Sequence, residues 1–139
     1  MKYMKLFILS TMLVAGAWSC SPKTESVEEG DESTAVEWKG MDEFHMIMAE
    51  SFHPYRDSAN LAPARQYARE MVSLAEAWSE NELPEKVNND EVKGQLAQLK
   101  EATEALADLV EVGDDEAIGT SLTNVHDVFH HLQEAWYKK

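Results

Sequence analysis

The sequence predicts an all-α protein whose folded part, residues 37–139, is an up-down-up-down antiparallel four-helix bundle. Apolar residues recur there at spacings of three and four, the period of an amphipathic helix, and neither strand-like alternation nor a hairpin turn sequence occurs. The predicted connections are short, so consecutive helices should run antiparallel around the single modest core that this length allows.

The first 19 residues have the features of an export signal. Lys2 and Lys5 precede an apolar stretch over residues 6–17, too short to cross a bilayer, and small residues follow up to Cys20. This segment resembles the signal of a bacterial lipoprotein, and the resemblance implies that the Cys20 thiol carries a lipid. An ordinary cleaved signal followed by a chance cysteine is the alternative.

Residues 20–36 are predicted to be a disordered acidic tether between the lipid and the bundle. They are rich in Ser, Thr, Glu and Asp and cannot bury enough apolar surface to offset the entropy lost on ordering. Ser21 follows the cysteine, whereas an Asp there resembles the inner-membrane retention signal of Gram-negative lipoproteins. We therefore expect an exported lipoprotein of the outer membrane or cell surface, with no second cysteine for a disulfide.

The first helix is predicted from about Gly40 to His53, with Trp38 plugging the core before it. Pro54 is expected to end this helix, because proline clashes with the preceding turn and disfavours helical geometry at the residue before it. Its apolar face is formed by Met41, Phe44, Met48, Phe52 and Tyr55.

The second helix is predicted to begin after Asn60 as its cap, with Pro63 in its first turn, and to stop between Asn81 and Pro84. Its apolar stripe is Ala64, Tyr67, Met71, Leu74 and Trp78.

The third helix is predicted to start at Asp90 as its cap and to end at Gly113; Asp114 or Asp115 should cap the fourth. The third stripe is Val92, Leu96, Leu99, Thr103, Leu106 and Val110. The fourth stripe is Ile118, Leu122, Val125, Phe129, Leu132 and Trp136.

The chain is strongly acidic, with a formal net charge of −14. Loss of Lys2 and Lys5 with the signal removes two positive charges and brings the mature chain to −16. Such a surface repels nucleic acid and anionic lipid headgroups, which argues against both as partners, and it attracts cations. Solubility alone is the alternative reason for the acidity.

Four histidines form two pairs on the predicted first and last helices: His45 with His53, and His126 with His130. At about 100° per residue, all four are displaced in the same sense from their apolar stripes. In antiparallel packing such positions face each other, so the two pairs should share one seam. His131 points to another face and is left out.

These pairs predict a metal site. His126 and His130 are four residues apart, the spacing by which one helix face offers two imidazoles to one ion. His45 and His53 lie about 12 Å apart along an ideal helix, too far for one tetrahedral ion unless Pro54 unwinds the helix end. With His45 opposite His126, we expect His45, His126 and His130 to bind zinc or copper, and His53 to be the fourth ligand or the hydrogen-bonding partner of one.

The motifs Phe44-His45, Phe52-His53 and His126-x-x-x-His130 resemble those of small exported bacterial helical proteins with paired FH and HxxxH histidines. The resemblance implies a shared bundle and a shared use of these histidines, without supplying a substrate.

Three other metal or cofactor sites remain open. Glu50 with His53, and Asp127 with His130, have the carboxylate–histidine spacing of ferritin-like di-metal bundles. Those bundles also need inward acids, for which Glu70, Glu76, Glu101 and Glu104 are available outside the apolar stripes. The size resembles cytochrome b562, which implies haem between Met48 and His126. Thioether sulfur could instead bind Cu(I) at Met41, Met46, Met48 or Met71.

No nucleophile constellation and no glycine-rich phosphate loop occur, so we expect a protein that is not an enzyme. The leading hypothesis is a lipid-anchored envelope protein that binds zinc or copper for sensing, buffering or delivery. The alternative is a metal-free helical interaction module that docks an envelope partner protein.

Overall fold

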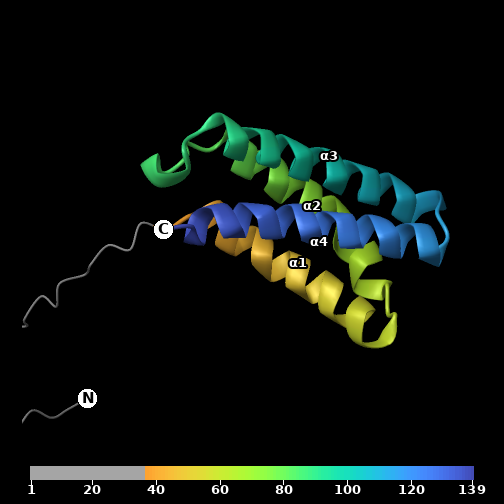
Figure 1. Ribbon diagram of the computed structural model, residues 1–139. Helices are drawn as coiled ribbons and strands as arrows, with labels where there is room; N and C mark the ends of the chain where they lie inside the picture. The colour runs from red at the N-terminus through yellow and green to blue at the C-terminus, as the bar shows by residue number, and fades with distance from the viewer. Residues whose placement is uncertain (1–36) are drawn as a thin grey trace, which may run out of the picture. The chain divides into compact units, whose positions relative to one another are not determined.

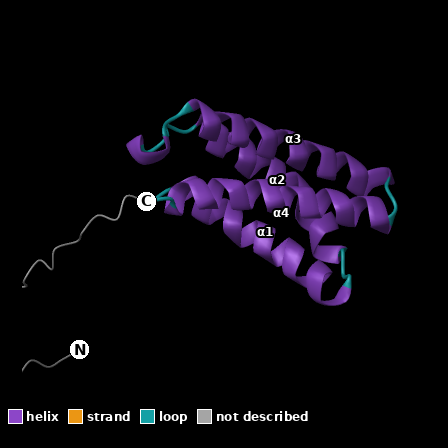
Figure 2. Ribbon diagram, in the orientation of Figure 1, coloured by secondary structure: helices purple, strands orange, loops and turns teal. Residues whose placement is uncertain are grey.

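The computed structural model describes residues 37–139 and forms a bundle of four α-helices with one short 3₁₀ helix (Figures 1 and 2). In chain order these are α1 (Lys39–Ser58), α2 (Ala62–Glu80), η1 (Glu85–Val87), α3 (Asp90–Val112) and α4 (Asp115–Tyr137). Each helix packs against the next, and α1 also contacts α4. The up-down arrangement predicted from the apolar spacing is confirmed.

The described residues, 37–139, belong to one compact unit with its own core. The predicted signal, Cys20 and the acidic tether lie outside the described residues. Within residues 37–139, no helix combines the length and apolar character that a bilayer span requires.

Short polar side chains begin α3 and α4, close to the predicted positions. Asp114 Oδ1 accepts a hydrogen bond from the Ala117 backbone N–H at 2.8 Å, as expected for one of the two proposed caps. The cap of α3 is one residue earlier than predicted, because Asn89 Oδ1 accepts from Val92 N–H at 2.9 Å and Asp90 is already helical.

The end of α1 differs from the prediction, because the helix continues through Pro54 to Ser58. Pro54 lies near the end of α1, where the helix accommodates its ring and its missing N–H donor, and the Pro54 carbonyl accepts from the backbone N–H of Asn60 at 3.1 Å. Ala59, with φ of 54°, closes the helix in the left-handed region. His53 therefore stays within a continuous helix and does not fold back toward His45.

The core is built from the predicted stripes of all four helices, closed at one end by Trp38 before α1 and Val87 in η1. The largest fully buried side chains are Trp78, Phe44, Phe129, Met71, Leu99 and Leu106. Small buried residues that the stripes did not include let the helices approach closely. They are Ser51, Ala68, Ala75, Ala102 and Ala107.

α1 and α4 run antiparallel and pack through a ladder of aromatic rings, with the start of α1 beside the end of α4 (Figure 1). The ring pairs are Trp38–Trp136 at 5.6 Å, Phe44–Phe129 at 5.7 Å and Phe52–His126 at 3.8 Å between centroids. Near the start of α4, the absence of a side chain at Gly119 makes room for the ring of Tyr55. The packing of α1 on α4 thus sets the positions of the histidines on these two helices.

Candidate metal centre

His126 and His130 lie one turn apart on α4, with their Nε2 atoms 3.0 Å apart (Figure 1 shows the helix). A tetrahedral zinc ion about 2.0–2.1 Å from each of two imidazole nitrogens holds those nitrogens about 3.3–3.4 Å apart. The two ring nitrogens are thus within about half an ångström of the chelating separation. In the structure these two nitrogens are hydrogen-bonded, so an ion would take the place of the shared proton.

The His126 ring is held in place by three neighbours. Phe52 of α1 stacks on it at 3.8 Å with 17° between the planes, and the ring centroid of His130 is 4.3 Å away. Its Nδ1 lies 3.2 Å from Asp127 Oδ1. If Nδ1–H is donated to this carboxylate, the lone pair is on Nε2 and faces His130. Metal-ligating histidines are commonly oriented by such a carboxylate.

Partial burial lowers the pKa of His126 below its ordinary value, since desolvation disfavours the charged ring. Positive charge on His130 or His53 lowers this pKa further, while the hydrogen bond to Asp127 opposes the shift. The neutral imidazole is the form that binds metal, so the environment of His126 favours the ligand form at neutral pH.

His45 and His53 are exposed on α1, and His53 also lines a hollow between α1 and α2. The His45 ring stacks on Phe129 at 5.5 Å and 9°. His53 follows Phe52, and its charge is near enough to influence His126.

The expectation that His45 lies opposite His126 is wrong. His126 instead faces Phe52, about two turns further along α1 than His45. The relative level of α1 and α4 depends on two intervening helices of 19 and 23 residues, so short loops alone do not determine it.

Within residues 37–139, no group of three or more His, Cys, Asp or Glu side chains is arranged to hold one ion. The structure thus brings together two of the four predicted ligands, His126 and His130. The other two predicted ligands lie apart from them: His45 stacks on Phe129, and His53 is the residue after Phe52 on α1.

The other sites find less support in side-chain placement. The only buried polar side chains among the described residues are Ser51 and Thr103, so no carboxylate there reaches the core as a ferritin-like centre needs. Three of the four methionines suggested for Cu(I) are core residues, and Met48, the methionine suggested for haem, is one of them. Met46, the fourth, is 65% exposed.

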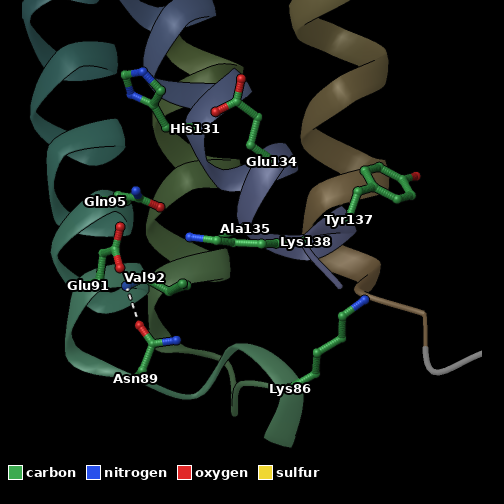
Figure 3. Close-up of a pocket in the computed structure, with 10 residues that line it drawn as sticks. All are labelled: Lys86, Asn89, Glu91, Val92, Gln95, His131, Glu134, Ala135, Tyr137 and Lys138. Atoms are coloured by element: carbon green, nitrogen blue, oxygen red, sulfur yellow. Dashed lines mark hydrogen bonds between the residues drawn. The ribbon is translucent and has the colours of Figure 1, made fainter.

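A separate hollow of about 750 Å³ lies between η1, α3 and α4 (Figure 3). His131 lines it, so this histidine faces a different part of the surface from the seam, as its position on the predicted fourth helix indicates. Its charged lining is mixed: Lys86, Lys138, Glu91 and Glu134. The balance of charges indicates no preference for one sign of ligand.

Comparison with known protein families, curated proteins and solved structures finds no match for this chain. The fold defines a four-helix all-α domain with a close imidazole pair on the α1–α4 seam.

Proposed function

We propose that this protein binds a late first-row transition metal, zinc or copper, through the Nε2 atoms of His126 and His130. The 3.0 Å separation of these two atoms is the observation that carries the proposal. The stacked Phe52 ring and the Asp127 carboxylate support it, because they hold the His126 ring in a suitable orientation.

The short distance between the two Nε2 atoms favours an ion that binds two nitrogens at an angle well below 180°. Two nitrogens on opposite sides of a linear ion, each about 2.0 Å away, would be about 4 Å apart. Buried methionines supply no thioether to the pair, and imidazole suits zinc and copper generally. We therefore place zinc or Cu(II) ahead of Cu(I).

In a single chain, a pair of side chains at the surface leaves the remaining coordination positions to water or to a second protein ligand. Buffering or delivery of metal in the cell envelope is consistent with this arrangement, with the protein held by a lipid on Cys20. The acidic surface would raise the local concentration of cations.

Calorimetric titration of tag-free protein with zinc and with copper tests the proposal. His126→Ala and His130→Ala should each weaken binding at least tenfold, since one imidazole alone cannot chelate. His131→Ala is the matched control, because it removes an exposed histidine of the same helix without touching the pair, and it should bind as the parent does. Unchanged affinity in both test variants would refute the site.

The second candidate, a metal-free interaction module, has one observation in its favour. Exposed Met46 lines a shallow, largely apolar hollow of about 500 Å³ between α1 and α2, together with Pro54, Pro63 and Tyr67. A protein with this function would show the same thermal midpoint with zinc, copper or a chelator.

A further inference from the structure

We propose that the ion is shared by two copies of this chain, each supplying His126 and His130, and this proposal rests on the metal site proposed above. Zinc in a closed protein site takes four ligands in a tetrahedron. The described part of one chain offers two nitrogens 3.0 Å apart, close to the chelating separation, and no group of three ligands. A second pair of imidazoles related by a twofold axis would complete the shell with the same donor type.

The exposure of the pair allows this approach. His130 is exposed, and the His126 side chain retains 22% of its accessible surface. His45, whose ring stacks on Phe129 beside His130, is exposed as well. Two copies can therefore meet at a part of the surface rich in imidazoles, although each chain is acidic as a whole.

Charge also balances at such a junction. The Asp127 carboxylate lies 3.2 Å from His126 Nδ1 and is 64% exposed. Two chains bring two such carboxylates close to one doubly charged ion, which makes the assembly locally neutral. Each carboxylate would stabilise the orientation of its own ligand.

Association should depend on the ion, because the described surface lacks a large apolar patch that would drive it alone. The exposed large apolar side chains are Met46 on α1, Val112 on α3 and Tyr137 on α4. They lie on three different helices, so metal-free protein is expected to be a monomer.

Sedimentation velocity and zinc titration of residues 34–139, which contain all the described helices and omit Cys20, test this inference. We expect a monomer in chelator, a doubled mass with zinc, and saturation at one ion per two chains. Removal of zinc by a chelator should restore the monomer, a check that needs no substitution.

The double variant His126→Ala/His130→Ala should stay monomeric with zinc while keeping its helical circular dichroism, and His131→Ala should dimerise as the parent does. Zinc binding at one ion per chain to a monomer would overturn the shared site and leave the proposed function intact. Absence of any zinc or copper binding would overturn both. Zinc-dependent dimerisation of the double variant would assign the junction to other residues and overturn the inference.

Discussion

His126 combines features that the other histidines of α1 and α4 lack. It is the only one of them that is half-buried, and it contacts an aromatic ring, a carboxylate and a second imidazole at once. Burial and the neighbouring imidazoles disfavour its charged form, whereas Asp127 favours it. The neutral form of this ring is therefore favoured, and its Nε2 atom faces His130.

The lowered pKa of His126 predicts that the fold loses stability in acid. Between the folded pKa and the ordinary value of 6.5, the unfolded chain binds more protons than the folded chain, so the free energy of unfolding decreases as pH is lowered through this window. The contribution is fully present above pH 6.5. Urea unfolding of residues 34–139 with a chelator, repeated across this range, measures it.

His126→Gln should reduce the dependence on pH in that window, because glutamine does not titrate. His131→Gln is the control and should keep the slope of the parent. If the free energy of unfolding of His126→Gln keeps the same dependence on pH as the parent, the proton uptake belongs to other groups.

Asp127 is predicted to strengthen metal binding without touching the ion. Loss of a carboxylate that orients a ligating histidine typically costs about 10–100-fold in metal affinity, so Asp127→Ala should weaken zinc binding by a factor in this range. Glu134→Ala is a matched control, since Glu134 is an exposed acid of the same helix that lines the other hollow. Equal weakening in both variants would indicate a general effect of charge instead of orientation.

At the scale of helices, the sequence predicted what depends on local geometry. The spacing of four between His126 and His130 brings them together in any regular helix, and the apolar stripes follow from the same periodicity. The predicted caps were less accurate, because Leu61 stands at the N-cap of α2 in place of Asn60 and Asn89 caps α3 in place of Asp90. Which residues of α1 face which residues of α4 depends instead on the lengths of the helices between them and on the continuation of α1 past Pro54. This is why His45 was expected beside His126 and lies against Phe129.

Two helical glycines, Gly119 in α4 and Gly94 in α3, are predicted to respond in opposite ways to alanine. A Cβ at Gly119 would overlap the ring of Tyr55, so Gly119→Ala should destabilise the fold by about 1–3 kcal/mol. A Cβ at Gly94 would meet nothing within 4 Å, so Gly94→Ala should stabilise α3 by up to about 1 kcal/mol.

Denaturant unfolding of both glycine variants measures this difference. Because both gain the helix propensity of alanine, their contrast isolates the steric contact with Tyr55. Equal stability of the two variants would show that α1 and α4 separate at this point without cost.

At the scale of the whole molecule, the imidazole pair lies where the last helix closes the bundle against the first. A single core supports this contact, so the stability of the fold and occupation of the site are linked by mass action. Ligand at about 100 times its Kd adds about 2.7 kcal/mol to the free energy of unfolding. For a domain of about 100 residues, each kcal/mol raises the Tm by about 4–8 °C.

The shared ion predicts that the Tm in zinc depends on the concentration of protein. A dimer held by the ion dissociates when it unfolds, so raising the concentration of residues 34–139 at saturating zinc should raise the Tm. In chelator, the monomer should melt at one temperature throughout. Differential scanning calorimetry over a hundredfold range of concentration measures both series, with His131→Ala matching the parent. A zinc-induced shift that is constant over that range would indicate a site complete within one chain, because binding to a monomer stabilises it equally at every protein concentration when free zinc is held constant.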